Sequence, residues 1–150
     1  MRIAFVSSEV FPYAKAGGLG DVSGALPKAL QKLGHSVKVF IPKYSAINFE
    51  GIHLEYSSEI GEMPIRVAGQ VHNTRVFKSM MADSRVEIYF VDCPWYFERW
   101  GHDGKPLIYT DHADEDERFI HFTKSVIEAL QRLQWAPDVI NVNDWPTALL

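Results

Sequence analysis

The chain has 150 residues and a formal net charge of −4, with 47% hydrophobic and 23% charged residues. This is the length of about one ordinary domain, and the proportions are those of globular proteins, which excludes disordered and fibrous classes.

The negative charge argues against a surface for nucleic acid or for an anionic membrane. The single cysteine, Cys93, has no partner for an internal disulfide and no metal-ligand spacing around it. The N-terminus lacks the profile of a secretion signal, and no apolar run reaches the ~20 residues that span a bilayer, so we expect a cytoplasmic protein.

The N-terminal third predicts a strand, a helix and a second strand. Residues 3–6 are apolar without interruption, as in a strand that is buried on both faces. Residues 36–41 are predicted to form the second strand, so the two strands are expected to pair in parallel through a right-handed crossover. The intervening helix is predicted from an apolar stripe that is typical of a helix lying on a sheet: Val22, Ala25, Leu26, Ala29, Leu30 and Leu33.

The ends of this helix have their own signals. We expect Asp21 or Gly20 as the N-cap and Gly34 as a left-handed C-terminal cap. Pro27 lies inside the pattern and removes a backbone hydrogen bond, so we expect a kink there or a loose first turn.

The remainder of the chain predicts more of a doubly wound sheet. Residues 51–81 alternate in polarity around Gly, Asn and Pro, which indicates an antiparallel hairpin insertion. Residues 86–91 read as a further buried strand and residues 138–142 as the next strand, and a helix between them presents one apolar side. Residues 94–116 form a long irregular loop, a type that is often functional. The fold class is therefore α/β, with a Rossmann-like parallel sheet and a β-hairpin insertion. Residues 146–150 read as the first turn of another helix, so we expect the domain of residues 1–150 to be incomplete.

Polar residues follow all four predicted parallel strands, at the sheet edge where α/β folds form a ligand crevice. A crevice and ordinary polar loop ends explain this pattern about equally well. The strand ends are Ser7-Ser8-Glu9, Pro42-Lys43, Asp92-Cys93 and Asn143-Asp144.

The loop after the first strand contains Lys15-Ala16-Gly17-Gly18-Leu19-Gly20-Asp21. Its glycine spacing does not fit the dinucleotide fingerprint, and Lys15 precedes the glycines, which excludes a Walker A loop. Glycines at a helix N-terminus nevertheless offer free N–H groups and a positive dipole to an anion, and Lys15 adds a full charge. We therefore expect a diphosphate site, with a simple glycine turn and a solvated lysine as the alternative.

These residues resemble the Lys-x-Gly-Gly-Leu signature of bacterial glycogen synthases and plant starch synthases. The resemblance runs in register from residue 1 to residue 150 and is weakest across the hairpin insertion. Its further blocks are Gly20-Asp21-Val22, Gly24-Ala25-Leu26-Pro27, Leu33-Gly34-His35, Ile41-Pro42-Lys43-Tyr44, Tyr96-Phe97-Glu98-Arg99, Tyr109-x-Asp111, Glu117-Arg118-Phe119 and Asn143-Asp144-Trp145.

The resemblance implies a retaining glycosyltransferase of the GT-B type that moves glucose from ADP-glucose to the non-reducing end of an α-1,4-glucan. This chain would be the N-terminal, acceptor-side half, inactive alone and without a confident catalytic residue, metal site or cofactor. Lys15, Gly17 and Gly18 would bind the donor diphosphate. The expected glucan-binding residues are Glu9, Asp21, Tyr96 and Asp144, with a helix N-cap as the alternative role for Asp144.

Two features depart from the family pattern. Asn141 and Asn143 stand where the family often has histidines, and asparagine cannot titrate near pH 7. The resemblance places the family's later His-containing motif beyond Leu150, and none of the six histidines here matches that motif, so we expect each on the surface or in a loop. A non-catalytic polyglucan-binding or regulatory module, or a GT-B enzyme with a different sugar donor, remain alternatives.

Overall fold

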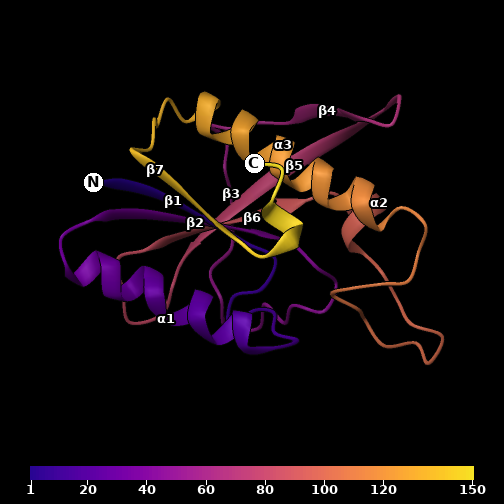
Figure 1. The fold of residues 1–150 in the computed structure, drawn as a ribbon, viewed down its shortest axis with the longest axis horizontal. Coiled ribbons are helices and arrows are strands. Elements are labelled where there is room, and N and C mark those ends of the chain that lie inside the picture. Colours follow the sequence, from indigo (N-terminus) through magenta and orange to yellow (C-terminus); the bar gives the residue numbers. More distant parts are fainter.

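The computed structural model describes residues 1–150 as one seven-stranded sheet with helices on both faces. Helix α1 lies on one side of the sheet and α3 on the other (Figure 1). The elements in chain order are β1 (Arg2–Ser7), α1 (Gly18–Lys32), β2 (Ser36–Pro42), β3 (Glu55–Tyr56), β4 (Met63–Val67), β5 (Gln70–Met80), β6 (Glu87–Asp92), α2 (Pro94–Phe97), α3 (Glu115–Arg132), β7 (Val139–Asn143) and the 3₁₀ turn η1 (Trp145–Thr147).

The centre of the sheet is parallel, as predicted. The strand order is β3-β5-β6-β2-β1-β7, and β1 pairs in parallel with both β2 and β7. Strand β6 pairs in parallel with β2, whereas β5 runs antiparallel to β6. Ala4, Phe5 and Val6 of β1 are completely buried, because helices and loops cover both faces of this central strand. The α/β fold class is therefore confirmed.

The predicted hairpin insertion is also confirmed. Strands β4 and β5 pair antiparallel, with Val67 opposite Gln70, so only Ala68 and Gly69 form the turn. Their φ angles are 48° and 80°. Two positive φ values define the type I′ turn that matches the twist of a two-stranded ribbon.

Helix α1 differs from its prediction. It begins at Gly18 with Gly17 as the N-cap, and it continues through Pro27 to Lys32. Most of the expected apolar stripe faces away from the sheet, because Val22, Leu26 and Leu33 are 52%, 37% and 75% exposed. Leu30 packs against the core, and the buried residues of the helix are Gly20, Ser23 and Pro27.

Close packing explains this rotation of the helix. A Cβ atom added at Gly24 would lie 2.6 Å from the Phe11 carbonyl oxygen, and one at Gly20 would lie 2.9 Å from Cγ of Lys15. The loop after β1 therefore presses against the small residues of α1, and larger apolar side chains are excluded from that face. Gly34 has a φ of 86° after the last turn, as expected for a left-handed cap.

The connection from β6 to β7 is more ordered than predicted. Its first part contains the short helix α2, and the rest leads to α3, whose buried face includes Phe119, Phe122 and Val126. The predicted C-terminal helical turn is the 3₁₀ turn η1. None of the helices combines the length and apolar character needed to cross a membrane.

Candidate anion-binding site

The switch point of the sheet lies between β1 and β7. From β1 the chain moves to β2 on one side, and it returns to β7 on the other. The loops that follow β1 and β7 therefore diverge, and ligands bind in the crevice that such divergence leaves. Ser7 and Asn143, the last residues of the two strands, are paired neighbours in the register. The loops that carry Lys15 and Asp144 thus start side by side.

The glycine-rich loop presents free amide groups at the start of α1. Gly17 caps the helix without a side-chain hydrogen bond, so first-turn N–H groups remain available. A Cβ atom added at Gly17 or Gly18 would meet nothing within 4 Å. Folding therefore does not require glycine at these two positions, and the open space suits the approach of a ligand to the backbone. The expected donor-site residues Lys15, Gly17 and Gly18 are brought together here.

Lys15 contacts Asp21, which the sequence analysis assigned to the glucan. The Lys15 Nζ atom donates hydrogen bonds of 2.7 and 2.6 Å to the two carboxylate oxygens of Asp21. The two side chains are 42% and 57% exposed, so solvent screens the pair and it contributes little to stability. The pair does fix the lysine ammonium beside the first turn of α1.

Glu9 does not point into solvent, contrary to the expected glucan-binding role. It is 4% exposed. Its Oε2 atom accepts hydrogen bonds from the backbone N–H groups of Ala16 at 2.8 Å and Gly17 at 2.9 Å. The Tyr109 hydroxyl donates to Oε1 at 2.7 Å. Both carboxylate oxygens are thus hydrogen-bonded within the chain, and Glu9 holds the backbone of the glycine-rich loop.

The protonation state of Glu9 follows from these contacts. Burial alone would raise the pKa of this carboxyl, but the hydrogen bonds from Gly17, Ala16 and Tyr109 stabilise the charged form. Together they lower the pKa of Glu9 below its usual value. The loop is therefore held by a carboxylate that stays ionised near neutral pH.

Tyr96 is not available as a stacking platform, which corrects the second glucan-binding assignment. The side chain is 1% exposed. Its ring lies 4.9 Å from the ring of His72 and 5.0 Å from that of His121, and its hydroxyl donates to Glu117 at 3.4 Å. Tyr96 belongs to the packing between α2, β5 and α3. The same cluster shows that the expectation for His121 was wrong, because this histidine is completely buried.

Asp144 remains exposed at the end of β7 and has an unusual backbone. Its φ and ψ angles are 65° and 176°, a combination that is almost confined to glycine and that marks stored strain at functional sites. The Oδ1 atom accepts a hydrogen bond from Trp145 N at 2.7 Å. The capping alternative is therefore real, and Asp144 itself is exposed.

The other strand ends are structural. Asp92 is 3% exposed and is held by Lys43 at 3.2 Å and by Arg75 at 2.8 Å. Asn143 donates to the Val6 carbonyl oxygen at 3.0 Å and so ties β7 to β1. For these two residues the interpretation as ordinary strand ends is the better one.

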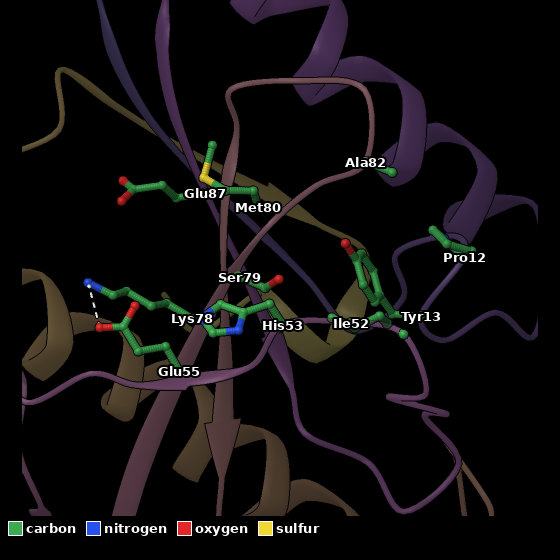
Figure 2. Close-up of a pocket in the computed structure, with 11 residues that line it drawn as sticks. Pro12, Tyr13, Ile52, His53, Glu55, Lys78, Ser79, Met80, Ala82 and Glu87 are labelled. Carbon is green, nitrogen blue, oxygen red and sulfur yellow. Dashed lines mark ion pairs between the residues drawn. The ribbon is translucent and has the colours of Figure 1, made fainter.

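The largest cavity, about 540 Å³, is not lined by any residue of the glycine-rich loop, and Figure 2 shows residues that border it. Pro12, Tyr13 and Ile52 border it on one side and the Glu55–Lys78 ion pair on another. None of the cavities is lined by Lys15, so the glycine-rich loop is an open surface. No three His, Cys, Asp or Glu side chains are grouped to hold a metal ion.

Sequence reasoning missed the roles of Gly20 and Gly24, which are required for packing rather than for ligand approach. The available signal was their spacing of four residues, which places both on one face of α1. It also missed Tyr109, whose only signal was its place within the Tyr109-x-Asp111 block.

The fold is Rossmann-like, and its glycine-rich loop places one lysine beside a helix N-terminus that no side chain caps. The chain belongs to the starch synthase catalytic domain family, whose model matches residues 2–150. The family resemblance of the sequence is thus confirmed.

Curated relatives named glycogen synthase match the entire chain. The relative from Clostridioides difficile is 40% identical to this chain over 150 residues, and the relative from Fusobacterium nucleatum is 40% identical over 151 residues. The catalytic domain of starch synthase IV from Arabidopsis thaliana, solved with bound ADP and acarbose, superposes with a TM-score of 0.83 at 28% identity and covers 97% of this chain. The chain spans 30% of each of the two curated relatives and 28% of the solved domain.

Proposed function

We propose that these residues form the N-terminal, acceptor-side half of a retaining glycosyltransferase that adds glucose from ADP-glucose to the non-reducing end of an α-1,4-glucan. The observation that carries the proposal is the position of Lys15 beside the start of α1. No side chain caps the helix there, and the space around Gly17 and Gly18 is open. Family membership and the names of the relatives support the glucan-synthesising reaction. The ADP bound to the solved neighbour supports ADP-glucose rather than UDP-glucose as the donor.

The donor-side chemistry follows from the charge that develops on the leaving group. As the glycosidic bond to the diphosphate breaks, negative charge accumulates on the phosphate oxygens. A lysine ammonium and a helix N-terminus stabilise this charge and so lower the barrier. Lys15 would exchange Asp21 for a phosphate oxygen, an exchange that costs little because the pair is exposed.

The acceptor side would use exposed carboxylates as hydrogen-bond acceptors for sugar hydroxyls. Asp144 is the best placed of the four expected residues, since it lies on the other loop of the switch point and is exposed, with only Oδ1 used in capping. Asp21 is exposed and borders the same loop as Lys15. Glu9 and Tyr96 have supporting roles and do not contact the glucan.

The rest of the active site would come from a second Rossmann-like half. The chain spans 30% of its glycogen synthase relatives, and its glycine-rich loop is not enclosed by a cavity. A closed, water-free site is needed to transfer glucose to a sugar hydroxyl rather than to water. We therefore expect glucosyl transfer only when a C-terminal half faces this loop.

A chimera tests this function. Residues 1–150 replace the matching segment of the Clostridioides difficile relative, and transfer of labelled glucose from ADP-glucose to glycogen is measured. Activity that falls at least about a hundredfold in a Lys15→Gln chimera, as loss of a group acting on transition-state charge predicts, supports the proposal. A folded chimera that binds ADP-glucose without transferring glucose, or whose transfer is insensitive to Lys15→Gln, contradicts it. The same assay with UDP-glucose separates the two donors.

A further inference from the structure

The long loop between β6 and α3 reaches the glycine-rich loop through one side chain, Tyr109. Its hydroxyl donates to Glu9 Oε1 at 2.7 Å and lies 2.8 Å from the hydroxyl of Ser8. Glu9 in turn accepts from the N–H groups of Ala16 and Gly17 with its other oxygen. A continuous hydrogen-bonded path therefore joins Tyr109 to the two residues that follow Lys15.

Tyr109 is itself held in place from two sides. Its ring lies 6.1 Å from the rings of both Phe119 and Trp145. Phe119 belongs to α3, and Trp145 follows Asp144 on the other loop of the switch point. The tyrosine thus lies where three segments meet, and its hydroxyl points toward Glu9.

The residue after Tyr109 is hydrogen-bonded to a partly buried ion pair of α3. Thr110 donates through its backbone N–H and its hydroxyl to the carboxylate of Glu115. Arg118 Nη1 binds both oxygens of Glu115 at 2.9 and 3.0 Å, and Arg118 is completely buried. Because a buried, paired arginine has no freedom to move without losing its partner, α3 fixes the loop backbone beside Tyr109.

We propose that Tyr109 is a positioning residue, which acts through Glu9 to hold the Ala16–Gly17 backbone in the conformation that binds a diphosphate. This inference rests on the proposed function of the glycine-rich loop. A carboxylate that is fixed at one oxygen by Tyr109 presents its other oxygen to both amide groups at once. Without the tyrosine hydroxyl, Glu9 rotates more freely, and the loop that places Lys15 becomes less ordered.

This role differs from general structural support. Tyr109→Phe removes only the hydroxyl and retains the ring that packs against Phe119 and Trp145. A purely structural tyrosine would lower the stability of the whole domain when changed. A positioning tyrosine changes the order of Ala16 and Gly17 and the affinity for a diphosphate, while the sheet remains intact.

The test uses the ¹⁵N-labelled chain and two NMR readouts, amide hydrogen exchange and titration with inorganic diphosphate. Tyr56→Phe is the matched control, since Tyr56 is 41% exposed on β3 and its ring contacts Phe77. For Tyr109→Phe we expect exchange at Ala16 and Gly17 to increase about tenfold and diphosphate to bind about fivefold more weakly, the scale of one charge-assisted hydrogen bond. Tyr56→Phe leaves both quantities unchanged. Unchanged exchange at these two amides in Tyr109→Phe overturns the proposal.

A second variant tests whether Tyr109 acts through Glu9. In Glu9→Ala the acceptor of both amides is absent, so adding Tyr109→Phe produces no further increase in exchange at Ala16 and Gly17. A further increase in the double variant would show an independent route and contradict the path through Glu9.

The two proposals fail separately. If diphosphate perturbs the glycine-rich loop but Tyr109→Phe leaves exchange unchanged, the positioning role is wrong and the proposed function stands. If the wild-type loop binds no diphosphate, the positioning role for that ligand fails even if Tyr109 orders the two amides, whereas the proposed function fails when glucose transfer by the chimera is insensitive to Lys15→Gln.

Discussion

The ammonium of Lys15 is bound by both carboxylate oxygens of Asp21, at 2.7 and 2.6 Å. The pair spans the glycine-rich turn and joins the loop after β1 to the first turn of α1. The lysine is therefore oriented before any ligand arrives, and its charge is balanced by a neighbour that an anionic ligand would have to displace.

The first prediction concerns the charge of Asp21. In Asp21→Asn the repulsion between this carboxylate and a bound anion is absent, so inorganic diphosphate should bind about three- to fivefold more tightly at low salt, as expected for one exposed charge. Isothermal titration calorimetry or NMR titration measures the change. Asp103→Asn is the matched control, because Asp103 is equally exposed, at 57%, and also pairs with a lysine. Weaker binding in Asp21→Asn would mean that orienting Lys15 matters more than the repulsion.

The glycines of the loop and helix should separate into two classes. Gly24→Ala places a Cβ atom 2.6 Å from the Phe11 carbonyl oxygen, so we expect it to lower the free energy of unfolding by about 1–3 kcal/mol, as overpacking does. Gly18→Ala meets no neighbour within 4 Å and should fold with wild-type stability but bind diphosphate more weakly. Urea denaturation measures stability. Equal stability of the two variants would contradict the close contact between α1 and the loop.

Burial of His121 predicts a pH dependence of stability. Burial, with the nearby charges of His72 and Lys124, lowers the pKa of His121 to about 3. The unfolded chain binds a proton at this residue near its ordinary pKa of ~6.5, whereas the folded chain does not. The contribution to stability is therefore complete above that pH and is lost as the pH falls toward 3, by up to about 1.4 kcal/mol per pH unit.

Denaturation at pH 7 and pH 5 checks this dependence. His121→Gln keeps a polar group near the Thr74 hydroxyl, which bonds Nε2 of the histidine at 2.8 Å, and it should flatten the loss of stability between the two pH values. His53→Gln, which changes an exposed histidine, should not. The same slope in the wild type and in His121→Gln would exclude His121 as its origin.

The hairpin turn offers a stabilising change. Ala68 has a φ of 48° at the first central position of the β4–β5 turn, a conformation that costs an L-residue with a Cβ atom about 1–2 kcal/mol. Asparagine is favoured at this position of a type I′ turn, so Ala68→Asn should raise the free energy of unfolding by about 0.5–1 kcal/mol. Ala82→Asn, at an exposed loop position, serves as the control. No increase in the thermal midpoint of Ala68→Asn alone would argue against the I′ geometry.

The sequence predicted β1, β2 and β6 well because their apolar runs allow little other than burial on both faces. Strand β7 was predicted as a strand, but it lies at the edge of the sheet, where Val139, Ile140 and Val142 remain exposed. The buried face of α1 was wrong for a specific reason. Periodicity places Val22 and Leu26 on the apolar face, but the close approach of the loop at Gly20 and Gly24 admits only small residues. That approach is a tertiary contact, and its one local signal was the four-residue spacing of Gly20 and Gly24.

The donor and acceptor parts of the candidate site differ in how far local sequence describes them. Lys15, Gly17 and Gly18 form a local motif at the start of a helix, and their role as a donor site stays a prediction. For Glu9 and Tyr96 the residue types suited a sugar, but burial and hydrogen-bond partners decide their roles. The partners of Glu9 include Tyr109, 100 residues away, which sequence patterns cannot connect.

Titration of the ¹⁵N-labelled chain with inorganic diphosphate tests the central role of Lys15 most directly. We predict that the amide signals of Gly17, Gly18 and Leu19 shift on binding, and that Lys15→Gln weakens binding at least about tenfold, as loss of a charge-assisted contact implies. Lys32→Gln, an equal charge change in the last turn of the same helix, leaves the affinity unchanged. Shifts that are absent from these amides, or that persist with the same affinity in Lys15→Gln, would contradict the account.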